Sequence, residues 1–214
     1  MNFIPIVLPC LIFIFTSGNS DWKLRKDDAG VEIYTRSIEG SAFDEFKGVI
    51  TIEKRSLTEV LDVILDVKNY TDLYPDCIEA KILYQEGKYY DIHYFNIRAP
   101  WPVKNRDAVY ESTTTVSDDG RYAKVSLKPV GDYIEENEES VRMYNGSGFW
   151  ELEEDDNKNT RITYQFHADP GGEIPAWLAN SVVVSNPYKT LQNLRNKINQ
   201  FTTSSKQESN MQVP

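Results

Sequence analysis

The sequence predicts an α+β domain in which one curved antiparallel sheet packs against a long C-terminal helix. Three observations lead to this class. Between residues 22 and 167 about nine segments alternate apolar and polar residues as strands do, with short turns between them. One internal segment, 56–69, has helical spacing instead. The last element, from Pro175 to about Phe201, carries an apolar stripe at helical spacing that can cover a sheet face.

The N-terminal part is expected to form a hairpin, a third strand and the internal helix. The first three strands are expected at 22–27, 31–38 and 43–53. The turn Asp27-Asp28-Ala29-Gly30 joins the first two. Ser56 can cap the following helix, and Glu59, three residues on, completes a capping box. The helix should end near Asn69.

The rest of the domain is expected to return to strands and to end in the long helix. The later strands are expected at 79–85, 89–97, 107–116, 122–130, 141–152 and 161–167. Pro100 and Pro102 exclude a central strand between the second and third of these. Pro187 is expected to kink the last helix or to open its hydrogen bonds locally. The polar tail 202–214 is expected to be disordered.

The first residues have the composition of a secretory signal peptide. The apolar run 3–15 is about 13 residues long, too short for a membrane-spanning helix of about 20. Small and polar residues follow it, so we expect cleavage near residue 20, a mature domain over 21–201, and a secreted or periplasmic protein. An uncleaved membrane anchor is the alternative. Without this leader Cys77 is the only cysteine, and no intrachain disulfide can form.

The net charge limits the partners of the protein. The 214 residues include 23 Lys and Arg against 33 Asp and Glu, which gives a formal net charge of −10. Binding to nucleic acid relies on clustered cations that displace counterions, so nucleic acid is not an expected partner. The same balance argues against docking on anionic membranes by charge alone.

Signals for catalysis or metal binding are weak in this sequence. The two histidines are His93 and His167, and each has an aspartate two residues away on the same strand face. A metal site needs three or four converging ligands, so ordinary hydrogen-bonded histidines are favoured. The sequence lacks a G-x-S-x-G elbow, a P-loop and a G-x-G-x-x-G loop. We therefore expect no catalytic residues, no metal and no cofactor.

Three ordered blocks give the sequence a resemblance to the START family of lipid-transfer domains. The first is Pro100-Trp101-Pro102 with Asn105-Arg106-Asp107-Ala108-Val109. The second is Gly148-Phe149-Trp150-Glu151-Leu152. The third runs from Thr160-Arg161-Ile162-Thr163-Tyr164 through Asp169-Pro170-Gly171-Gly172 to Ile174-Pro175-Ala176-Trp177-Leu178-Ala179-Asn180. The resemblance covers about Trp22 to Phe201.

The resemblance implies a helix-grip fold, with a curved antiparallel sheet wrapped around the C-terminal helix and an internal tunnel for one lipid or sterol-like molecule. His93 and Ser112 stand where family members often place an acidic residue and an arginine. His93, with Asp91 nearby, would then hydrogen-bond the polar end of the ligand. The residues expected to bind the ligand are Asp91, His93, Phe95, Ile97, Ser112, Leu178, Val182 and Val183. Those expected at the entrance or in membrane contact are Trp101, Pro102 and Trp177.

The favoured function is binding, and possible transfer, of a lipid or another apolar molecule, without catalysis. The expected partners are that ligand and, transiently, a membrane, with the protein as a monomer. Two alternatives stay open. One is an enzyme similar to the polyketide aromatase/cyclases of the same superfamily, with His93 as an acid or base. The other is an interaction module that holds no ligand.

Overall fold

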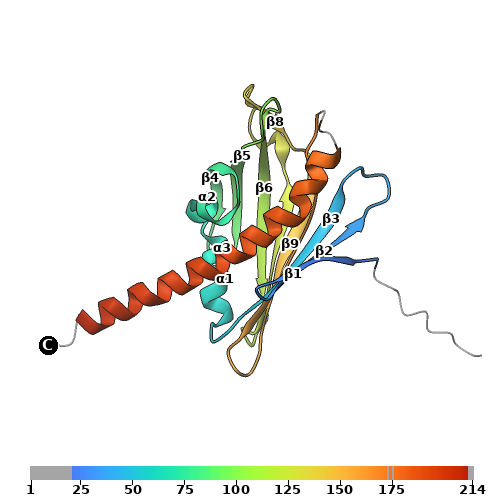
Figure 1. The fold of residues 1–214 in the computed structure, drawn as a ribbon. Helices are drawn as coiled ribbons and strands as arrows, with labels where there is room; N and C mark the ends of the chain where they lie inside the picture. Colours follow the sequence, from blue (N-terminus) through green and yellow to red (C-terminus); the bar gives the residue numbers. More distant parts are fainter. Residues whose placement is uncertain (1–20, 173, 175, 212–214) are drawn as a thin grey trace, which may run out of the picture.

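The structure is a computed structural model in which a curved sheet wraps around one long helix (Figure 1). It describes the backbone of residues 21–172, 174 and 176–211, and the side chains of these residues except 176–181 and 201–211. The expected signal peptide, residues 1–20, lies outside the described residues. The antiparallel sheet and the C-terminal helix confirm the predicted α+β, helix-grip fold class.

Ten strands form one sheet. They are β1 Lys23–Asp28, β2 Val31–Ser37, β3 Asp44–Ile52, β4 Cys77–Glu86, β5 Tyr90–Ile97, β6 Asn105–Val116, β7 Tyr122–Pro129, β8 Ser140–Arg142, β9 Asn145–Glu154 and β10 Thr160–Asp169. Their order is β1-β2-β3-β10-β9-β7-β6-β5-β4, with β8 beside β6. All pairs are antiparallel except β8 with β6. The predicted first hairpin is confirmed, with Asp28 paired to Val31 across its turn.

The segment expected as one strand over 141–152 is two strands, so that prediction is wrong. Strand β8 pairs with the start of β6, whereas β9 lies between β7 and β10. The backbone therefore changes its pairing partners between β8 and β9, and this change occurs at Met143 and Tyr144. Both halves have strand-like residues, so the change of partner has no local signal in the sequence.

The internal helix begins as predicted and ends earlier than predicted. Helix α1, Leu57–Leu65, starts with the predicted capping box, in which Ser56 and Glu59 bond reciprocally to backbone N–H groups. It ends at Asp66, whose side chain caps a short 3-10 helix, Val67–Asn69. Helix α2, Tyr70–Leu73, follows. The single helix expected over 56–69 is therefore broken where Asp66 offers its backbone neighbours an alternative acceptor.

The C-terminal helix α3, Ala176–Met211, is longer than predicted. Residues 202–211 were expected to belong to a disordered tail, but they continue the helix. They include no Pro or Gly, so nothing in their sequence stops it. Pro187 lies inside α3. No helix in the described part of the chain has the length and hydropathy needed to span a bilayer.

The core lies between α3, α1 and the concave face of the sheet (Figure 1). Leu191 and Leu194 of α3 are fully buried, as are Trp150 and Leu152 of β9. Polar contacts fix the helix on both sides of this core. The Tyr188 hydroxyl donates to Asp28 at 2.6 Å, and Lys197 pairs with Asp72 at 2.5 Å.

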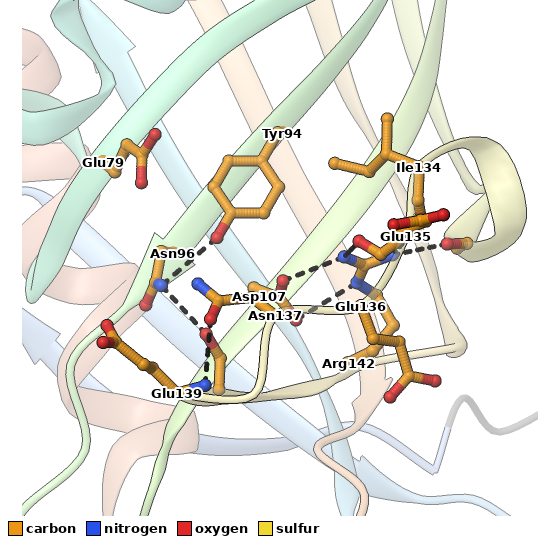
Figure 2. Close-up of polar contacts among 12 residues, drawn as sticks. Glu79, Tyr94, Asn96, Asp107, Ile134, Glu135, Glu136, Asn137, Glu139 and Arg142 are labelled. Carbon is orange, nitrogen blue, oxygen red and sulfur yellow. Dashed lines mark hydrogen bonds and ion pairs between the residues drawn. The ribbon is translucent and has the colours of Figure 1, made fainter.

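A buried ion pair fastens the outer face of the sheet (Figure 2). Arg142 of β8 donates from Nε and Nη2 to the two carboxylate oxygens of Asp107 on β6, at 3.1 and 3.0 Å. It also donates to the backbone carbonyls of Gly131, Ile134 and Glu135. One guanidinium therefore holds the acidic segment 131–139 against the strands.

Replacing Asp107 with alanine should lower the free energy of unfolding by about 3–5 kcal/mol, because the Arg142 charge would stay buried without a counter-ion. Urea denaturation of the purified protein measures the effect. The exposed pair of Arg121 with Asp156 supplies the control, and Asp156→Ala should change the same quantity by less than about 1 kcal/mol. Equal small losses for both variants would contradict a structural role for the buried pair.

Candidate functional site

A cavity of about 230 Å³ lies between the concave face of the sheet and α3. Strands β3, β5, β6, β7 and β10 supply its floor, α2 one side and α3 its roof. Its volume is below the range of about 300–1,000 Å³ that is common for drug-sized ligands. This size favours a compact or narrow ligand.

Aromatic side chains dominate the wall of this cavity. Eight of the described lining residues are aromatic: Phe43, Phe46, Tyr70, Tyr74, Phe95, Tyr110, Tyr164 and Phe166. Several of these rings contact one another; the centroids of Phe95 and Tyr110 are 5.7 Å apart, and those of Tyr110 and Phe166 are 5.6 Å apart. Such a wall offers a ligand mainly apolar surface, whose burial contributes about 25 cal/mol per Å².

Strand alternation and one glycine place these rings. Tyr164 and Phe166 follow Ile162 at a spacing of two on β10, so they share its concave face. Tyr164 stacks on Trp150 with a centroid separation of 3.9 Å. Phe166 lies over Gly148 on β9, where a Cβ would stand 2.3 Å from its Cδ2 atom. The glycine of the Gly148-Phe149-Trp150 block therefore makes room for an aromatic ring in the wall.

His93 and Asp91 form a buried polar pair on the same strand face. His93 lines the cavity and is 2 % exposed, and its Nδ1 lies 2.6 Å from a carboxylate oxygen of Asp91. Asp91 lies behind it and is not among the lining residues. The Tyr70 ring meets the imidazole edge-on, with centroids 5.3 Å apart. Together these contacts hold one imidazole against the cavity in a fixed orientation.

The tyrosines of the wall add neutral hydroxyl groups. Burial raises the pKa of Tyr70, Tyr74, Tyr110 and Tyr164 above the usual value, so each phenol keeps its proton. The hydroxyl of Tyr110 is buried without a hydrogen-bond partner among the described residues. The wall therefore contains uncharged groups that can form hydrogen bonds.

The structure brings together five of the eight residues predicted to bind a ligand. They are His93, Phe95, Ile97, Val182 and Val183, all in the wall. Ser112 is buried opposite Asp91 in the β5–β6 pair, but it does not line the cavity. Leu178 belongs to the side chains that the structure does not describe.

Sequence reasoning missed most of the aromatic wall. It did not select Tyr70, Tyr74, Tyr110, Tyr164 or Phe166. For β10 a signal was present, because the rings continue the alternation of a core residue. For α2 the sequence carried no such signal, because this helix is short and only the tertiary structure places it beside the cavity.

The predicted entrance loop lies between β5 and β6. Trp101 is 93 % exposed and Pro102 is exposed as well. Asn105 closes the loop by accepting a bond from the Ala99 N–H at 3.1 Å. The Trp177 side chain, predicted at the same entrance, lies outside the described side chains.

Arg106 joins this region to the chain that leads into α3. Its guanidinium donates to the carbonyl oxygens of Pro170 and Gly171 at 3.2 and 2.9 Å. Val182 of α3 lines the cavity and is 41 % exposed, so the cavity reaches the surface near this helix. The start of β6 and the entry of α3 therefore meet beside the cavity.

No group of three or more His, Cys, Asp or Glu side chains in the described ranges is arranged to hold a metal ion. His167 bonds instead to the hydroxyl of Ser41 at 3.0 Å.

Comparisons with known proteins agree on one family. The family model of the START domain matches residues 16–204. An uncharacterised protein of Pseudomonas aeruginosa, PA1579, is 39% identical over 183 residues, which cover 84% of this chain and 89% of that protein. Human phosphatidylcholine transfer protein is 26% identical over 168 residues, 76% of this chain and 77% of its own. The crystal structure of a STAR-related lipid transfer protein from Xanthomonas axonopodis superposes with a TM-score of 0.76 at 37% identity, covering 84% of this chain and 99% of the other.

Gly148→Ala should lower the free energy of unfolding by about 1–3 kcal/mol, because the new methyl group overlaps Phe166 and the Gln165 carbonyl. Thermal or urea unfolding measures this loss. Ser147 is exposed on the opposite face of the same strand, and Ser147→Ala should stay within about 0.5 kcal/mol of the parent. If Gly148→Ala leaves the free energy of unfolding unchanged, the groups around Gly148 can shift to accommodate the methyl group.

Proposed function

The chain belongs to the START domain family, and from this premise we propose that it binds one lipid or other apolar molecule in its internal cavity. The relatives that carry lipid-transfer names support binding of this general class. The observation that carries the proposal for this chain is the aromatic cavity closed by α3. Burial of apolar ligand surface against these rings supplies the binding free energy.

We propose that the protein holds and releases this ligand without a chemical step. The wall is mostly apolar and aromatic, with phenols, one imidazole and few other polar groups (Asp44, Asn186 and Thr190), which suits retention of an intact molecule. The tunnel that the resemblance implies would run from this cavity towards Val182. Release into a membrane fits the exposed indole of Trp101, because tryptophan prefers the membrane–water interface.

The sequence supports two further parts of the proposal. The apolar run in residues 3–15 favours a cleaved signal peptide and a site of action outside the cytoplasm. The net charge of −10 favours brief membrane contacts made by apolar side chains, with the protein acting as a monomer.

Purified native protein should carry an apolar small molecule that survives gel filtration and is released by organic solvent. Mass spectrometry of the extract measures it, and protein denatured before the column serves as the control. Intact mass of the same sample shows whether residues 1–20 have been removed. Repeated recovery of ligand-free protein that also takes up no added lipid would overturn the proposal.

Trp101→Ala should slow transfer of a fluorescent lipid between vesicles by about tenfold and leave the equilibrium affinity for that lipid unchanged. The reason is that Trp101 is exposed, is not part of the cavity wall, and would lose its interfacial contact. A stopped-flow transfer assay and a titration measure the two quantities.

Tyr133, which is exposed at the end of the short 3-10 helix Gly131–Tyr133, supplies the control, and Tyr133→Ala should leave both quantities unchanged. If Trp101→Ala transfers lipid at the parental rate, the loop has no role in exchange.

A further inference from the structure

Arg106 is a buried cation whose side chain bonds to the backbone. It is 6 % exposed, and its guanidinium donates to three carbonyl oxygens, those of Lys104, Pro170 and Gly171. The other buried guanidinium, that of Arg142, has the carboxylate of Asp107 as a counter-ion. Within the described residues, the charge of Arg106 is met by carbonyl dipoles alone.

Two glycines place the chain against this guanidinium. Strand β10 ends at Asp169 and α3 begins at Ala176, so the chain turns between them. Gly171 and Gly172 have left-handed backbones, with φ of 63° and 64°, which residues with a Cβ rarely adopt. A Cβ on Gly172 would stand 3.3 Å from Nη2 of Arg106. The turn therefore fits closely over the guanidinium.

The same turn forms part of the cavity wall. Ala168 and Pro170 line the cavity, and the Pro170 carbonyl is one of the acceptors of Arg106. Val182, near the start of α3, also lines the cavity and is 41 % exposed. Arg106 itself is not among the lining residues. It therefore acts on the wall from behind, without contact with a bound molecule.

The later part of α3 has anchors of its own. Hydrogen bonds fix it to the first hairpin and to α2 through the side chains of Tyr188, Asn193, Arg195 and Lys197. All four follow Pro187, whose missing N–H removes one bond from the helical ladder. The helix can therefore keep its place on the sheet while the chain before it moves.

We propose that Arg106 is a positioning residue that sets how long a molecule stays in the cavity. Moving the turn 169–172 away from the sheet breaks two of its bonds and leaves a buried charge short of partners. Movement of this turn then limits both entry and release. The inference rests on the proposed function, and it assigns control of exchange to a residue outside the cavity wall.

Arg106→Ala should release N-phenylnaphthylamine, a neutral apolar dye, about tenfold faster than the parent protein, because the turn loses two bonds to a charged group. Capture should accelerate by a similar factor, so the dissociation constant should change by less than about threefold. Stopped-flow fluorescence of the full-length protein measures capture on mixing and release on dilution.

Two controls separate positioning from general stabilisation. Lys104→Ala removes a cation two residues away, whose ammonium group bonds to the Glu138 carbonyl at 3.0 Å, and it should keep the parental rates. Guanidinium ion, added well below denaturing concentrations, should restore slow release to Arg106→Ala, whereas uncharged urea should not. A residue that only stabilises the fold would not show this rescue.

Gly172→Ala tests the inference from the other side of the contact, even where Arg106→Ala does not fold. It should also release the dye faster, because the methyl group crowds Nη2 of Arg106 and strains the left-handed backbone. Circular dichroism shows which variants are folded.

The outcomes separate the inference from the proposed function. Parental release by folded Arg106→Ala, or by folded Gly172→Ala where the arginine variant does not fold, would overturn the inference and leave apolar ligand binding intact. Faster release with an equally large loss of affinity and no rescue by guanidinium would also overturn it. If the parent protein takes up neither the dye nor any lipid offered in vesicles, both fail.

Discussion

The contact between α3 and the concave face of the sheet governs the rest of the structure. Leu191 lies so close to β3 that a Cβ on Gly48 would stand 2.7 Å from its Cδ1 atom. This close approach, with Leu194 and Ile198 beside it, fills the core under one part of the helix. Nearer its N-terminus the same helix presents Val182 and Val183 to the cavity. One element therefore stabilises the domain and covers the aromatic cavity.

Charge is distributed in a way that suits this division. The ion pair of Asp107 with Arg142 is on the outer face of the sheet, away from the cavity, where it fastens the segment 131–139 (Figure 2). The cavity wall contains phenols, one imidazole and a single carboxylate, that of Asp44. A space with few charges can bury apolar surface without desolvating ions.

Local rules explain which parts of the fold the sequence predicted. The first hairpin and the capping box of Ser56 and Glu59 depend on residues within a few positions, and both are confirmed. The division of 141–152 into β8 and β9 depends on which strand each half pairs with, a choice made by residues far along the chain. The break after Leu65 depends on competition between helix and cap at Asp66. Strand pairing and helix breaks of this kind are therefore hard to predict from the local pattern of apolar and polar residues.

By itself the sequence determined the strand faces and the apolar stripe of α3, since periods of 2 and about 3.6 residues fix which side chains share a face. That is why Asp91, His93 and Phe95 could be grouped in advance. Only the tertiary structure decided that Tyr70 from α2, Tyr110 from β6 and Phe166 from β10 meet around one cavity. The physical reason is that strand order, sheet curvature and the seat of α3 over Gly48 bring together residues that no local period relates.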